Sequence, residues 1–139
     1  SGRGNELDFE HPQFGRVVLM TYNVDMDVNS HNDVPFTTKT FQSGDDKFAL
    51  FSTEYRVLNA SAQLFNQNGK LVFNVNSDND PPGYGRAVAF GNSCSSPGVY
   101  TAVFSGEIVP PKSWIFSGPP SGEYGRNYRI GSIDFFVTP

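Results

Sequence analysis

Residues 55–80 read YRVLNASAQLFNQNGKLVFNVNSDND, and this stretch decides the fold class. It contains two alternating apolar and polar runs joined by Asn68-Gly69. That dipeptide tolerates positive φ at both positions and favours a two-residue type I′ turn. The stretch therefore predicts a long β-hairpin.

The turn also fixes a register for this hairpin. One face becomes apolar on both strands and the other becomes rich in amides, a pattern that a one-residue slip would destroy. The opposed pairs are Leu64 with Phe73 and Ala62 with Val75 on the apolar face, and Gln63 with Asn74 and Ser61 with Asn76 on the other.

The composition indicates one folded domain. The chain has 139 residues, and its 14 Gly and 10 Pro lie between short apolar runs, as in a sheet protein with many turns. The net charge is −4 and the Lys and Arg are scattered, which argues against direct binding of nucleic acid. No apolar run approaches the roughly 20 residues of a membrane-spanning helix. Cys94 is the single cysteine, so an internal disulfide is excluded and the redox compartment stays open.

Further strands are expected on both sides of the hairpin. In residues 17–28 the even positions are apolar and predict the buried face. No segment shows a helical period with caps. Eight or nine strands predict an all-β, two-sheet antiparallel sandwich, jelly-roll-like, with a closed barrel as the alternative. We expect residues 1–16 to form an N-terminal arm or edge segment and residues 17–139 a single β-sandwich domain. The other expected strands cover residues 36–41, 48–51, 86–90, 99–109, 113–116 and 128–137.

Two groups of carboxylates are candidate calcium ligands. Asp25 and Asp27 project to one face of a strand, where they could share an ion with a neighbouring loop. Asp78 and Asp80 alternate with other residues as they enter a Gly-rich turn. The alternatives are a solvated strand face for the first pair and turn-forming side chains for the second.

Two similar loops suggest a ligand site. Residues 81–86 read PPGYGR and residues 119–126 read PPSGEYGR. A Tyr and an Arg on a Gly-rich loop can stack on a sugar ring and form paired hydrogen bonds with a carboxylate or hydroxyls. The candidate ligand-binding residues are therefore Tyr84, Arg86, Tyr124 and Arg126, with recurrent turn chemistry as the alternative reading. We expect Trp114 in the core or at a subunit interface.

The sequence carries no strong signature of catalysis, with a glycosidase pair of carboxylates as the alternative. His11 and His31 have no partner at zinc-binding spacing, and Cys94 lacks a local activating pattern. No nucleophile elbow, phosphate-binding loop or dinucleotide fingerprint is present. We therefore predict a protein that is not an enzyme.

Several stretches resemble the coat-protein jelly roll of small icosahedral RNA viruses. They are residues 55–65, residues 69–73 followed by SDNDPP at 77–82, KSWIFSG at 112–118 and GSIDFFV at 131–137. The resemblance covers about half the chain. The long Arg-rich arm of such shell domains is not found here, and a protruding domain of such a coat fits the length and charge better.

This resemblance implies a capsid or protruding domain that self-associates, in a virion or an extracellular setting, with an intracellular one not excluded. It implies that the Tyr-Gly-Arg loops face a receptor or a neighbouring subunit, and that Asp25 and Asp27 bind calcium at a subunit contact. A different class of protein also fits the residues, namely a lectin-like sandwich that binds glycans through the same loops and the amide-rich face.

Overall fold

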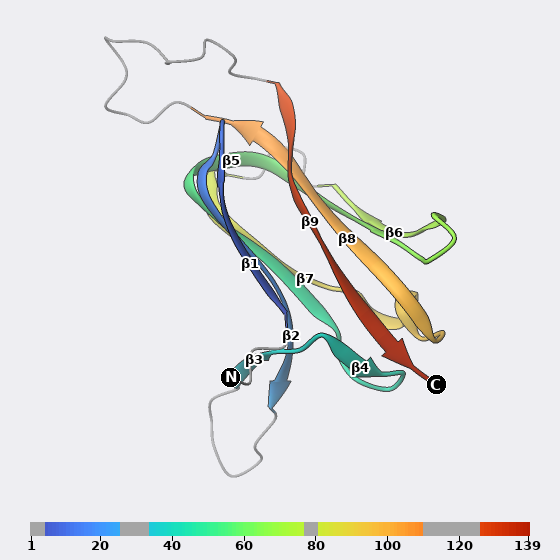
Figure 1. The fold of residues 1–139 in the computed structure, drawn as a ribbon. Coiled ribbons are helices and arrows are strands. Elements are labelled where there is room, and N and C mark those ends of the chain that lie inside the picture. The colour runs from blue at the N-terminus through green and yellow to red at the C-terminus, as the bar shows by residue number, and fades with distance from the viewer. Residues whose placement is uncertain (1–4, 26–33, 77–80, 110–125) are drawn as a thin grey trace, which may run out of the picture.

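The computed structural model describes residues 5–25, 34–76, 81–109 and 126–139, and within them the strands form one curled sheet (Figure 1). The strands are β1 (Glu6–His11), β2 (Gly15–Asp25), β3 (Val34–Thr37), β4 (Thr40–Gln42), β5 (Phe48–Phe65), β6 (Leu71–Val75), β7 (Gly83–Ala89), β8 (Gly98–Ile108) and β9 (Asn127–Thr138), and a short 3-10 helix, η1 (Gly91–Cys94), follows β7.

The sheet has a main path and three side branches. The main path runs β1-β2-β5-β8-β9-β4, while β3 pairs with β2, and β6 and β7 pair with β5. The pairing of β4 with β9 is parallel and every other pairing in the described residues is antiparallel. The all-β prediction is confirmed, and the described strands make a single curled, mixed sheet with the shape of half a barrel.

The long strand β5 belongs to both halves of this curl. Its first part pairs with β2 and β7, and its second part pairs with β8 and β6. Figure 1 shows β5 turning sharply between these two parts. The turn brings the inner side chains of the two halves together, and the rings of Phe51 and Phe104 lie 5.2 Å apart across the interior.

The predicted hairpin is present with the predicted register. Leu64 pairs with Phe73, and Ala62 pairs with Val75. The predicted two-residue turn is wrong. The amide of Gly69 donates to the carbonyl oxygen of Asn66, Gly69 has φ +79°, and the ladder shifts beside Phe65.

This connection is a four-residue turn over residues 66–69 whose last residue is the left-handed Gly69, and a bulge accompanies it. The side chain of Asn66 explains why the longer turn wins, because its Oδ1 accepts hydrogen bonds from the amides of Asn68 and Lys70 at 3.0 Å each.

The predicted buried face of the first long strand is wrong over residues 17–21, although Tyr22, at an even position, is buried. In β2 the odd positions Val17, Leu19 and Thr21 are fully buried, whereas Val18 and Met20 are only half-buried. Both faces of this strand carry apolar residues, so alternation did not distinguish them. Thr21 tolerates burial because its hydroxyl donates to the carbonyl oxygen of Thr38 at 2.6 Å and accepts from the side-chain amide of Asn5 at 2.8 Å.

The core fills the concave side of the sheet and is rich in aromatic rings. Phe135 on β9 is fully buried, and the ring of Phe90 stacks on it at 5.8 Å. Ile133, Phe135 and Val137 share the buried face of β9, as the alternation in that strand predicts. Among the described residues, no helix has the length and hydropathy needed to cross a membrane.

Candidate functional site

The sharp turn in β5 creates an irregular point in the sheet. The pairing with β7 shifts between Ser52 and Val57, and the pairing with β8 shifts between Leu58 and Ser61. Asn59 lies within the second of these shifts with φ +53°, the left-handed region that Asn tolerates better than most residues. The ladder is therefore interrupted here, which leaves room for a pocket.

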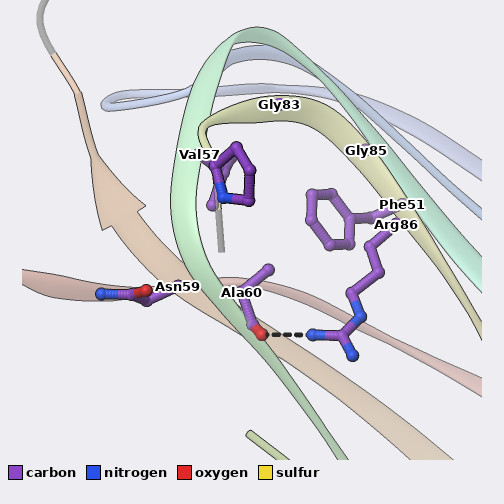
Figure 2. Close-up of a pocket in the computed structure, with 8 residues that line it drawn as sticks. Phe51, Val57, Asn59, Ala60, Gly83, Gly85 and Arg86 are labelled. Atoms are coloured by element: carbon purple, nitrogen blue, oxygen red, sulfur yellow. Dashed lines mark hydrogen bonds between the residues drawn. The ribbon is translucent and has the colours of Figure 1, made fainter. Parts of the chain in front are cut away.

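A pocket of about 110 Å³ lies between this turn and β7 (Figure 2). Its walls are about equally polar and apolar, and Arg86 is the charged residue among those that line it. The lining residues are Phe51, Val57, Asn59, Ala60, Pro81, Gly83, Gly85 and Arg86.

Arg86 crosses from β7 to the far side of the turn. Its Nη1 donates to the carbonyl oxygen of Ala60 at 2.8 Å, as the dashed line in Figure 2 marks. Arg86 pairs with Phe51 in the ladder, and these two side chains point to the same face. In Figure 2 the Phe51 ring lies near the start of the Arg86 side chain, and the guanidinium extends beyond it to Ala60.

The two lining glycines of β7 have different roles. A Cβ at Gly85 would lie 2.5 Å from the carbonyl oxygen of Phe51, so only glycine lets β7 approach β5 this closely. A Cβ at Gly83 would meet its nearest atom at 4.0 Å, an ordinary contact. Gly85 is thus needed for the close packing of the two strands, whereas Gly83 is not.

A second glycine contact supports the turn from the other side. A Cβ at Gly106 on β8 would overlap Cγ1 of Val57, a residue that lines the pocket. The side-chain amide of Asn59 points away from Arg86 and donates to Oε2 of Glu107 at 3.0 Å. These contacts tie β8 to the turn and leave Arg86 as the polar side chain directed into the pocket.

The four predicted ligand residues differ in how close they lie to the pocket. Tyr84 lies between the two lining glycines, and 58% of it is exposed. Arg126 is exposed just before β9 and is not among the residues that line this pocket. Tyr124 lies outside the described residues. Within the part of the chain that the structure describes, Arg86 therefore lines the pocket and Tyr84 lies on the same strand, β7. Arg126 does not line the pocket.

The predicted calcium ligands are scarcely covered by the structure. Asp25 is the last residue of β2, and only its backbone is described. Asp27, Asp78 and Asp80 lie outside the described residues. Among the side chains that are described, no three His, Cys, Asp or Glu residues gather closely enough to hold a metal ion.

A shallower groove lies on the outer face of β1, β2 and β5. It has a volume of about 480 Å³ and is lined by Glu10, Arg16, Val18, Ser52, Thr53 and Glu54. Arg16 pairs with Asp8 through two hydrogen bonds, Nε to Oδ1 at 3.0 Å and Nη2 to Oδ2 at 2.6 Å. This pairing lowers the pKa of the Asp8 carboxyl. The cation of the groove is thus already matched by a carboxylate.

Cys94 is fully buried at the end of η1. Burial raises the pKa of its thiol to about 11, although the charge of Lys47 acts in the opposite direction. Lys47 is itself buried and donates to the carbonyl oxygens of Ser43 at 2.9 Å and Asp45 at 2.8 Å. At neutral pH the thiol is protonated, and a protonated thiol is a poor nucleophile.

Neither a family model nor a curated protein sequence matches this chain. The sequence pointed to Arg86 and the glycines around it as candidates, but it did not predict which residues form the walls of the pocket. Phe51 was expected in a separate short strand over residues 48–51, and Val57 and Ala60 in the hairpin. In the structure all three lie on β5, and its turn makes them face β7. The one available signal was an Asn inside a strand pattern, since Asn adopts positive φ more readily than most residues.

Proposed function

We propose that this domain is a non-enzymatic carbohydrate-recognition module, and that it binds its ligand at the pocket between β5 and β7. The observation that carries this proposal is the guanidinium of Arg86, held by a hydrogen bond at a pocket whose walls are partly apolar and partly polar. Binding sites of this kind combine apolar walls with a few fixed polar groups that orient the ligand.

The exposed ring of Tyr84 supports the same proposal. Side chains two residues apart in a strand point to one face of the sheet, so Tyr84 and Arg86 share a face of β7. An exposed aromatic ring presents an apolar surface together with a hydroxyl, which suits the apolar face and the hydroxyls of a sugar. The ring and the guanidinium could therefore contact one saccharide at two points.

A glycan array probed with the protein and three variants tests this proposal. We expect Arg86→Ala and Tyr84→Ala to weaken the signal at least tenfold. Phe136→Ala is the matched control, because Phe136 is also an exposed aromatic residue but pairs with Val99 at the opposite end of β8. If Arg86→Ala and Tyr84→Ala leave a glycan signal unchanged, the proposed site is wrong.

A second candidate function is a self-associating coat or protruding domain, as the resemblance to viral coat proteins implies. Its support is the outer face of the sheet, where Val18, Met20, Phe48 and Leu50 are only half-buried. Met20 pairs with Leu50, so these side chains form a continuous apolar strip on adjacent strands. Such strips are typical of protein interfaces.

This second candidate includes two finer proposals. The first is that the two halves of the curl act as the layers of a jelly-roll-like, two-sheet sandwich, for which the packing of Phe51 against Phe104 is the support. The other is calcium binding by Asp25, Asp27, Asp78 and Asp80 at subunit contacts. Titration calorimetry with Asp25→Ala and Asp78→Ala tests the calcium proposal, because a true site should lose its binding heat in these variants.

Light scattering behind a sizing column separates the two candidate functions. A specific interface buries more than about 1,000 Å² and gives a defined oligomer at micromolar protein. An oligomer that dissociates in chelator, or on Met20→Asp, favours the coat domain. A monomer with the same mass in calcium and in chelator would count against the coat domain and favour the recognition module.

A further inference from the structure

We infer that the outer face of β1, β2 and β5 docks a basic amphipathic helix of a partner protein. The apolar side of this helix covers the strip formed by Val18, Met20, Phe48 and Leu50, and its Lys or Arg side chains lie over carboxylates of β1. Other residues line the pocket between β5 and β7, so the inference goes beyond carbohydrate recognition there. It also gives the apolar strip a different occupant from a second copy of the chain.

A row of carboxylates runs along one side of the apolar strip. The ladder places Glu6 of β1 beside Met20 of β2, and Met20 beside Leu50 of β5. Alternate residues of β1 share this outer face, and neighbouring strands lie about 4.8 Å apart. A helix about 10 Å wide therefore reaches both the apolar strip and the carboxylates. The acidic row consists of the exposed residues Glu6, Asp8 and Glu10.

The charges of this face are unbalanced. Its described residues include one cation, Arg16, which forms an ion pair with Asp8 at 2.6 Å. Within the described part of the chain, the carboxylates of Glu6 and Glu10 make no hydrogen bond or ion pair. A Lys or Arg of a partner placed over them gains electrostatic attraction, whereas nucleic acid or an anionic lipid surface is repelled. The partner is therefore basic where it meets β1.

The shallow groove on this face provides a place for one basic side chain. Its volume is about 480 Å³, and its lining includes Glu10 of β1, Val18 of β2 and Glu54 of β5. Oε1 of Glu54 accepts from the backbone amide of Arg16 at 3.0 Å, which holds that carboxylate at the groove. A long Lys or Arg side chain can lay its methylene groups on Val18 while its charged end stays near the carboxylates.

A second copy of the chain fits this face less well. In a two-fold contact each copy presents the same face to the other. That face offers Arg16 as its described cation, and Arg16 is already paired with Asp8, so Glu6 and Glu10 would gain no partner. The distance from Glu6 to Glu10 along β1 is about 13 Å, which two to three turns of a helix can span.

Three synthetic helical peptides test this inference. The first carries Leu on one side and Lys on the other, the second carries Leu and Glu, and the third carries Ala and Lys. Calorimetry measures the binding of each peptide to the native protein. We expect the Leu and Lys peptide to bind at least about tenfold more tightly than either of the others, and to bind more weakly as the salt concentration rises.

Variants of the protein assign this binding to the outer face. The double variant of Glu6→Gln with Glu10→Gln should weaken it at least about fivefold, and so should Met20→Ser. The matched controls are Glu107→Gln on β8 and Leu71→Ser, an exposed leucine on β6, and both should bind as the native protein does. Preserved β-sheet circular dichroism establishes folding, and the glutamate variant remains informative if Met20→Ser does not fold.

Several outcomes would overturn the inference. The absence of binding by the Leu and Lys peptide would do so, and equal binding of the Ala and Lys peptide would mean that the apolar strip takes no part. An equal loss in Glu107→Gln and in the double variant would trace the binding to the overall net charge. A defined dimer of the protein alone that dissociates in Met20→Ser would assign the strip to a second copy. Glycan binding through Arg86 and Tyr84 is measured separately and stands or falls by itself.

Discussion

His11 and Arg129 are 118 residues apart in the sequence, and Nε2 of His11 lies 2.7 Å from the carbonyl oxygen of Arg129. Nδ1 of the same ring accepts from the amides of Gln13 at 3.0 Å and Phe14 at 3.3 Å. Because Nδ1 is the acceptor, the proton lies on Nε2, which donates to Arg129. One side chain thus links the first hairpin to the last strand.

This link helps to close the curl of the sheet. β1 forms its backbone ladder with β2, and in the described part of the chain it meets β9 through side chains. Asn5 makes the corresponding contact at the other end, where its side-chain amide donates to the carbonyl oxygen of Asp134. Between them, Phe9 lies against Gly131, where an added Cβ would be 3.0 Å from the ring.

We predict that His11→Ala lowers the free energy of unfolding by about 1–3 kcal/mol, because the amides of Gln13 and Phe14 lose their acceptor and β9 loses a contact. His11→Asn is the matched control, since Oδ1 of Asn replaces Nδ1 but its shorter side chain cannot reach Arg129. It should recover the local part of the loss only. Urea denaturation measures both variants, and equal stability of His11→Ala and the native protein would contradict the role of this link.

The strand β7 offers a pair of glycines for the second prediction. Gly85→Ala should destabilise the protein by about 1–3 kcal/mol, because its Cβ would lie 2.5 Å from the carbonyl oxygen of Phe51 and force β7 away from β5. Gly83→Ala, two residues earlier, should change stability by less than about 0.5 kcal/mol. Thermal unfolding of the two variants makes the comparison, and a similar shift in both would show that the close approach is not the cause.

Adjacent phenylalanines in β9 test the position of the core. The ring of Phe135 contacts those of Phe41 at 5.3 Å, Phe90 at 5.8 Å and Tyr100 at 5.6 Å. Phe135→Ala should therefore cost about 3–5 kcal/mol. Phe136→Ala removes a ring that is 39% exposed and should cost under about 1 kcal/mol. The reverse order in guanidinium denaturation would mean that the faces of β9 are assigned wrongly.

The buried thiol of Cys94 predicts a loss of stability at high pH. Burial raises its pKa from 9.0 to about 11. Between these values the unfolded chain releases the proton and the folded chain keeps it, so a rising pH favours unfolding. The full difference is roughly 3 kcal/mol, at about 1.4 kcal/mol for each pKa unit.

Urea midpoints measured from pH 8 to pH 11 check this prediction. The pKa values of Tyr22 and Tyr100 are also raised by burial, and these groups contribute to any loss in the same range. Cys94→Ala retains both tyrosines, so the difference between the two pH profiles isolates the thiol. Parallel profiles would mean that Cys94 reaches solvent in the folded protein.

Local pattern in the sequence was enough to predict several parts of the fold. The hairpin register followed from alternation, because only one register placed Leu64, Phe73, Ala62 and Val75 on one side. The buried face of β9 followed for the same reason. Arg86 was found as a ligand candidate from its neighbours Tyr84 and Gly85, which mark an accessible segment.

Other parts depended on partners that are distant in the sequence. β2 is apolar on both faces, and the packing of Leu19 toward Gly131 of β9 decides which face is buried. The hairpin turn depended on the side chain of Asn66, whose Oδ1 competes with the tighter turn that Asn68-Gly69 favours. The pocket depended on a turn within β5. That strand contains no proline or glycine from which the turn could have been predicted.

The sequence by itself determined the all-β class, the placement of most strands and the hairpin register, because alternation with period two is a local property of the chain. Only the tertiary structure decided how the sheet curls and where the pocket forms. These features depend on close approaches between distant backbones, such as Gly85 against Phe51 and Gly106 against Val57. Such approaches arise when strands far apart in the chain are packed together, and no local pattern specifies them.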